Sequence, residues 1–106
     1  MKNPLNWWVR VELEDGSVWS VPVEPIARSR ASYYKDEFDN DFGRSLLEDT
    51  IPLFEADPWQ ITEWAKNQMN PDDPEYFPPG SIQLVDPAPP TQLWEVWQGE
   101  WEVKGK

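Results

Sequence analysis

Histidine and cysteine are both absent from this chain of 106 residues. Without cysteine, the chain cannot form a disulfide framework or a thiolate metal site. Without histidine, it lacks the commonest metal ligand and the side chain best placed for proton transfer near pH 7. We therefore expect a protein that is not an enzyme, with no catalytic residues, no metal and no cofactor.

Long hydrophobic runs are absent as well. No apolar stretch approaches the roughly 20 residues that a transmembrane helix needs, and the first residues contain no apolar signal-peptide core. The five glycines are scattered through the chain, so there is no glycine-rich phosphate loop. We expect a protein that is not secreted by a signal peptide, has no membrane partner and works in a cytoplasm.

Basic residues are scarce, because nine Lys and Arg stand against twenty Asp and Glu, a net charge of −11. Residues 1–35 carry four acidic and five basic side chains (net +1), residues 36–75 twelve and two (net −10), and residues 76–106 four and two (net −2). A middle segment this acidic repels phosphate backbones. Direct nucleic-acid binding is therefore not expected, and basic protein partners are favoured.

What the chain does contain is first an N-terminal hairpin. The stretch "WWVRVELEDGSVWSVPV" alternates apolar and polar residues around Asp15-Gly16. A three-residue loop, with Gly16 in the left-handed conformation of a G1 bulge, pairs Val11 with Trp19 and Val9 with Val21. This register places the large apolar side chains on one face, except Val18 and Trp8, and turns Trp8 outward opposite Pro22.

Three short helices are predicted next. From Glu24 the apolar spacing becomes helical, with a helix that ends near "FDNDFG". A second helix has a buried face formed by Phe42, Leu46, Leu47, Ile51 and Phe54, with a stop or kink near Thr50 before Pro52. A third begins with Asp57 as its cap, Pro58 at its first position and Gln60 completing a capping box, and ends at Asn70-Pro71.

Proline is concentrated after these helices, since seven of the twelve prolines fall within residues 71–90. We expect an α+β protein with a compact α+β body at residues 1–70, a proline-rich extended arm at 71–92 and a C-terminal β-hairpin at 93–106 that packs back on the body. A brief strand at 81–85 is predicted within the arm. With Gln98-Gly99 as the C-terminal turn, Val96 faces Trp101 and Trp94 faces Val103, an apolar set suited to the core. The same register places Glu95 opposite Glu102.

Four aromatic residues remain as candidate partner contacts. Trp8 and Trp97 are predicted on the outer faces of their hairpins, and Tyr76 and Phe77 lie in the arm. Tryptophan and tyrosine are favoured anchors of protein interfaces. We therefore predict partner binding at Trp8, Trp97, Tyr76 and Phe77.

Acidic residues gather in "KDEFDNDFGRSLLED". A calcium loop needs oxygen ligands at its first, third and fifth positions, glycine at the sixth and glutamate at the twelfth, and no register around Gly43 satisfies this. The carboxylates of Asp36, Glu37, Asp39 and Asp41 form either an ordinary solvated surface or an acidic surface that faces a partner. The one basic cluster, "RSRASYYK", lies beside Glu24, Asp36 and Glu37, so we expect its cations to be paired within the chain.

Several blocks in order resemble a set of small, uncharacterised tailed-bacteriophage proteins: "W-x-V-P-V-x-P-I-A-R-x-R-A-x-Y-Y", "RSLLEDTIPLFEADPWQI" and "EWAKNQMN". The resemblance covers residues 7–73 and, loosely, the tail. The chain departs from the pattern at Pro71, where these proteins tend to have tryptophan, and at Gln98, where they tend to have asparagine. The resemblance implies a phage protein in a virion or in the cytoplasm of a bacterial host, and it implies no activity.

Two functions are consistent with these observations. The first is a virion structural or assembly protein, such as a capsid decoration (cement) protein, whose partners are other virion proteins. The second is an acidic nucleic-acid mimic that inhibits a basic DNA- or RNA-binding protein of the host, as anti-restriction and anti-CRISPR proteins do.

Overall fold

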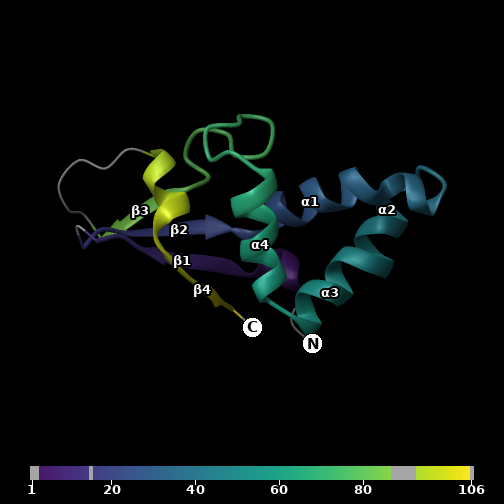
Figure 1. Cartoon of the computed structure of the whole chain (residues 1–106), viewed down its shortest axis with the longest axis horizontal. Helices are drawn as coiled ribbons and strands as arrows, with labels where there is room; N and C mark the ends of the chain where they lie inside the picture. The colour runs from purple at the N-terminus through teal and green to yellow at the C-terminus, as the bar shows by residue number, and fades with distance from the viewer. Residues whose placement is uncertain (1–2, 15, 87–92, 106) are drawn as a thin grey trace.

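The structure is a computed structural model that describes residues 3–14, 16–86 and 93–105, and only the backbone of Asp86, Leu93 and Trp94. In the described residues the chain has an α+β fold, as predicted (Figure 1). Its four strands form an antiparallel sheet in the order β3-β2-β1-β4. They are β1 (Trp8–Glu12), β2 (Val18–Pro22), β3 (Gln83–Asp86) and β4 (Glu100–Lys104).

The predicted N-terminal hairpin and its register are confirmed. Val9 lies opposite Val21, Val11 opposite Trp19 and Trp8 opposite Pro22. Gly16 has a φ of 89° and its N–H donates to the carbonyl oxygen of Leu13, which closes the loop that the bulge requires. A short 3-10 helix, η1 (Pro4–Asn6), precedes β1.

The first predicted helix is α1 (Val23–Tyr34), which continues as the 3-10 turn η2 (Lys35–Phe38). Ile26, Ala27 and Ala31 are fully buried. The helix ends where the sequence predicts, because Asp39 and Asn40 adopt left-handed backbone conformations. This turn and α2 form one end of the long axis of the molecule in Figure 1.

The second helical segment comprises α2 (Phe42–Arg44), the π-helix η3 (Ser45–Thr50) and α3 (Ile51–Ala56). The helical segment does not stop near Thr50 as predicted. It changes there from π-helical to α-helical hydrogen bonding, and the N–H of Ile51 bonds to the carbonyl oxygen of Leu46 five residues earlier.

Ile51 and Phe54 of this segment are buried as predicted, but Phe42 and Leu47 are 38% and 65% exposed. The prediction that both are buried is wrong. Phe42 is the first residue of the short helix α2, before the π-helix, and for Leu47 the prediction assumed an α-helical spacing. In a π-helix residue i bonds to residue i+5, so Leu46 lies above Ile51 and Leu47 turns outward.

The third predicted helix is α4 (Trp59–Gln68), with Ile61, Thr62 and Ala65 buried. The predicted capping box is not formed. The side-chain amide of Gln60 donates to the carboxylate of Asp57 over 3.2 Å, while the backbone N–H of Gln60 bonds to the carbonyl oxygen of Asp57. The two backbone N–H groups that the box requires, those of Gln60 and Asp57, donate instead to the carbonyl oxygens of Asp57 and Leu53.

The first part of the proline-rich arm is incorporated into the fold. Phe77 and Ile82 are 4% and 8% exposed and belong to the hydrophobic core. The predicted short strand is present as β3, which pairs with β2 at the edge of the sheet. The arm therefore contributes both to the core and to the sheet over residues 71–86, and residues 87–92 lie outside the described part of the chain.

The C-terminal hairpin predicted for residues 93–106 is wrong. Residues Leu93–Gln98 form the 3-10 helix η4, and β4 pairs with β1. In the hairpin Glu102 would face another glutamate, whereas beside β1 it lies opposite Arg10. Charge does not decide between the two partners, because the observed pairing also places Glu12 opposite Glu100. The apolar residues of β4 favour β1, where Trp101 and Val103 lie opposite Val11 and Val9 and pack against the core.

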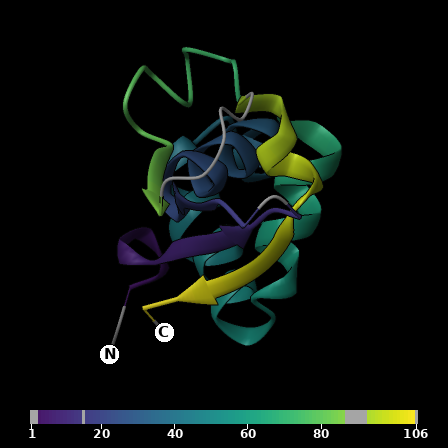
Figure 2. The same ribbon diagram turned by 90° about the vertical axis from the view of Figure 1, so that its left-hand side faces the viewer.

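The inner face of the sheet holds the core. Trp101 lies opposite Val11 and Val103 opposite Val9, and both pack against the core, as the alternation in β4 predicted. Val96 is fully buried, and the core position predicted for Trp94 lies outside the described side chains. Figure 2 shows the helices gathered on one side of the strands. The opposite face of the sheet bears Trp8.

Candidate partner-binding surface

A groove with a volume of about 480 Å³ lies beside Trp8. The beginning of β1, the end of β2, the first turns of α1 and the segment from Tyr76 to Ser81 form its walls. Trp8 is 38% exposed, and its cross-strand neighbour Pro22 also lines the groove. The hairpin register keeps both side chains on the outer face of the sheet, so the groove follows directly from the predicted pairing.

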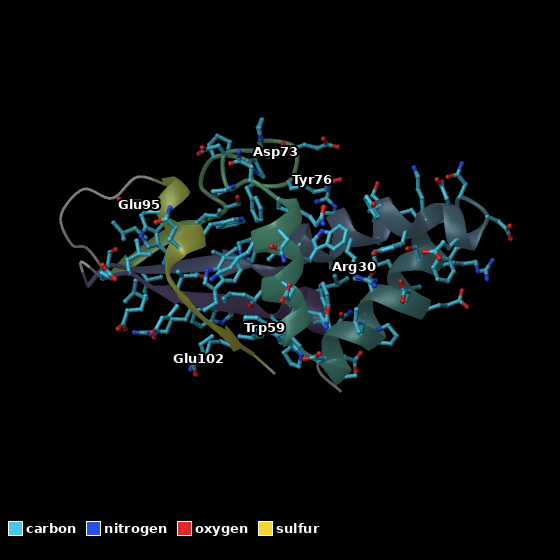
Figure 3. The ribbon with its side chains drawn as sticks, in the orientation of Figure 1. Arg30, Trp59, Asp73, Tyr76, Glu95 and Glu102 are labelled. Atoms are coloured by element: carbon cyan, nitrogen blue, oxygen red, sulfur yellow. The ribbon has the colours of Figure 1, made fainter. Side chains whose placement is uncertain are left out.

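Tyr76 and Arg28 line the same groove. The guanidinium carbon of Arg28 lies 6.0 Å from the centre of the Tyr76 ring, within the range of a cation–π contact. Figure 3 shows Tyr76 in the segment that follows α4. No carboxylate of the described residues forms an ion pair with Arg28. The pairing expected for Arg28 is therefore not found in the described structure.

Arg30, the next cation of the predicted basic cluster, forms an ion pair, but its partner is distant in the sequence and is not one of the adjacent acidic residues. Its Nη1 lies 2.8 Å from the carboxylate of Asp49 and 3.0 Å from the hydroxyl of Thr50. The guanidinium also lies 4.7 Å from the centre of the Tyr34 ring. Arg30 thus joins α1 to η3, and Arg28 alone of these two arginines faces the groove.

Polar groups of the groove retain free hydrogen-bonding capacity. Within the described part of the chain, no hydrogen bond uses the indole N–H of Trp8, the hydroxyl of Tyr76 or the side-chain amides of Asn6 and Gln83, all of which line the groove. Exposed groups of this kind are solvated in the free protein. They are therefore available to a ligand without loss of an internal bond.

Phe77 and Trp97 do not contribute to this surface. Phe77 is a core residue, and its ring packs edge-on against Trp97 with centroids 5.5 Å apart. Trp97 is half-buried against the core, and its indole N–H donates to the carbonyl oxygens of Ala65 and Met69. The prediction that Trp97 points away from the core is wrong, because η4 replaces the strand on which it was based.

The four acidic candidates lie outside the lining of the groove. Asp36, Glu37, Asp39 and Asp41 are all exposed, around the turn that ends the long axis in Figure 1. Two of them have local roles: the carboxylate of Asp41 accepts the N–H of Arg44 at the start of α2, and Asp39 lies 3.6 Å from the Arg44 guanidinium. The hydrogen bond and charge of Glu48, with smaller contributions from Asp39 and Asp41, raise the pKa of Arg44 above its ordinary value.

The sequence identified Trp8 and Tyr76 but not their neighbours. Arg28, Pro22 and Gln83 come from three elements, and only the tertiary fold brings them together. The signal for Pro22 was present, since it is the cross-strand partner of Trp8. Trp59, 58% exposed at the start of α4, lies outside the lining of the groove.

No group of three or more acidic side chains in the described residues is arranged to hold a metal ion. The helices of the described chain are all too short or too polar to cross a membrane. Comparison of the chain with models of protein families, with curated proteins and with solved structures yields no match.

Proposed function

We propose that this protein acts without catalysis, by binding another protein, and that it is a structural or assembly component of a virion such as a capsid decoration protein. The observation that carries the proposal is the groove in which Trp8, Tyr76 and Arg28 meet. Tryptophan, tyrosine and arginine are the residue types that most often anchor protein interfaces.

The position of these anchors supports binding to a protein surface. Trp8 is exposed on the open face of the sheet, and Tyr76 and Arg28 are held beside it by their mutual contact. The sheet offers rigid positions for two of the walls, which reduces the entropy lost when a partner binds. Because residues 71–86 belong to the fold, the partner contacts are assigned to this groove and not to a free arm.

The phage setting of the proposal comes from the sequence blocks that resemble small tailed-bacteriophage proteins. Those blocks include buried positions such as Ile26, Ala27 and Phe54, so they specify the packing of α1 and α3. The groove residues Trp8 and Pro22 precede α1, within the span of the resemblance.

The acidic mimic is the second candidate, and the exposure of Asp36, Glu37, Asp39 and Asp41 at one end of the molecule favours it. The carboxylate of Asp39 is 97% exposed. However, Asp41 caps α2 and Asp39 pairs with Arg44, so two of the four carboxylates also serve the local fold.

Mass spectrometry of purified virions tests the first candidate. The proposal expects the chain in the particle at a fixed copy number relative to the capsid protein, resistant to washing with high salt. Absence from the particle contradicts it. An acidic mimic would instead be recovered on a basic host protein, and that complex would dissociate as salt rises because exposed charges are screened.

A further inference from the structure

We infer that the groove beside Trp8 binds an extended, proline-rich segment of the partner that carries a carboxylate, which pairs with Arg28. This inference rests on the proposed function and adds the chemistry of the partner to it. It is carried by the walls of the groove, by its hydrogen-bond donors and by its charge.

The walls suit proline rings. Trp8, Pro22 and Tyr76 present flat or rigid apolar surfaces to the groove, together with Pro25 and Pro78. Proline-rich segments adopt the extended polyproline II conformation before binding, and they dock into grooves lined by aromatic residues. An open groove of about 480 Å³ has room for a few residues of such a segment.

The hydrogen-bonding groups of the groove match the same ligand. A proline-rich segment has few N–H donors, because proline lacks one, while its carbonyl oxygens remain free to accept. The groove offers donors in the indole of Trp8, the hydroxyl of Tyr76 and the amide of Gln83. The three have no internal hydrogen bond among the described residues.

Charge specifies the ligand further. Among the described residues, Arg10, Arg30, Arg44 and Lys104 each form an ion pair, although acidic side chains are in large excess. Arg28, Lys35 and Lys66 form none among the described residues, and of these three only Arg28 lines the groove, where it lies against the Tyr76 ring. A guanidinium positioned in this way can bind a carboxylate through two hydrogen bonds. Glu24 lines the groove too, so a basic ligand is the alternative that an experiment must exclude.

Three capped peptides test the inference on the full-length protein. Each is a heptapeptide of prolines around one central residue, which is glutamate, glutamine or lysine. Binding is followed by the indole N–H signals of the eight tryptophans in NMR spectra and by calorimetry. We expect a saturable shift of the Trp8 signal with the glutamate peptide, no shift of the Trp59 signal, and an affinity that decreases from glutamate to glutamine to lysine.

Substitutions then assign the contacts. Arg28→Gln should weaken binding of the glutamate peptide about tenfold and leave the affinity of the glutamine peptide unchanged, as expected when one charge-assisted bond is lost. Trp8→Ala should abolish measurable binding. Tyr76→Phe, which removes only a hydroxyl, should weaken all three peptides equally and keeps the test valid if Trp8→Ala fails to fold. The matched controls are Trp59→Ala and Arg44→Gln, which lie outside the groove and should bind as the wild type does.

Four results would overturn the inference: no saturable shift at millimolar peptide, tighter binding of the lysine peptide, equal weakening of the glutamate and glutamine peptides by Arg28→Gln, or concentration-dependent shifts of Trp8 without peptide. The last would identify a second copy of this chain as the occupant. If the chain is present in virions but the peptides fail, the inference is wrong and the proposed function stands. If the peptides bind but virions lack the chain, the groove binds the predicted ligand and the proposed virion role is wrong.

Discussion

The indole N–H of Trp97 donates to the carbonyl oxygen of Ala65 over 2.8 Å and so fixes η4 to the last turns of α4. It also lies 3.1 Å from the carbonyl oxygen of Met69. The carbonyl oxygen of Ala65 also accepts the backbone N–H of Met69, so the indole adds a second donor at the C-terminal end of α4. Trp97 therefore connects the C-terminal segment to the body.

Replacing Trp97 with phenylalanine should lower the free energy of unfolding by about 1–3 kcal/mol, because the smaller phenyl ring has no N–H to donate to Ala65 and Met69. Urea denaturation measures the effect. Trp59→Phe, on an exposed tryptophan, is the control and should stay within about 0.5 kcal/mol of the wild type. An equal response of the two variants would show that the Trp97 contacts contribute nothing.

Gly99 lies where the chain passes close to β1. A Cβ atom at this position would lie 2.6 Å from side-chain atoms of Leu13 and of Val11, and 2.9 Å from the carbonyl oxygen of Glu12. Gly99→Ala should therefore destabilise the protein by about 1–3 kcal/mol or more, since β4 must shift from its partner.

Gly43→Ala is the matched control for this prediction. Its new Cβ would approach only the side chain of Asp41, at 3.4 Å, within the short helix α2. Alanine favours the helix by about 0.5–1 kcal/mol, so this variant should be as stable as the wild type or more so. Thermal unfolding of both variants, followed by circular dichroism, tests the close approach of Gly99.

Arg30 connects α1 to η3 through Asp49 and Thr50, and its side chain is 14% exposed. Arg30→Met should destabilise the protein by about 1–3 kcal/mol, because it leaves the two partners without their donor. Arg44→Met, which removes an arginine paired on the exposed surface, should leave the urea midpoint nearly unchanged. If both substitutions have small effects, the Arg30 contacts do not hold the two helices together.

The acidic end of the molecule should tolerate neutralisation. Replacing Asp36, Asp39 and Asp41 with asparagine and Glu37 with glutamine should change the free energy of unfolding by less than about 1 kcal/mol, because asparagine still caps α2 at Asp41. Asp41→Ala alone should cost about 1 kcal/mol. The fourfold variant should therefore stay folded. It can test whether the four carboxylates are needed for this protein to bind a basic partner as an acidic mimic.

Local patterns in the sequence predicted the hairpin, since Gly16 and the alternation of Val9 and Val11 restrict its register. They failed at Leu47 because a π-helix shifts the faces of a helix without an obvious sequence signal. They failed at β4 because Val103 is suited to pairing either with a neighbouring segment or with β1. That choice depends on contacts distant in the sequence.

The candidate site was predictable only in part for the same reason. Trp8 was found because its outward position follows from pairing with Pro22. Its association with Tyr76 and Arg28 could not be found, because these residues lie on β1, in the segment after α4 and on α1. Phe77 and Trp97 were assigned to the surface since aromatic residues suit cores and interfaces equally well, and only packing distinguishes the two.

The most direct test of the proposed role is the incorporation of two tryptophan variants into virions. Trp8→Ala and Trp59→Ala remove exposed tryptophans, one inside the groove and one outside it. With both variants shown to be folded, quantitative mass spectrometry of the purified particles compares their copy numbers. We expect at least about a tenfold loss for Trp8→Ala, typical of an interface anchor worth more than about 1.4 kcal/mol, and wild-type levels for Trp59→Ala. Equal incorporation of the two variants would contradict the proposed role.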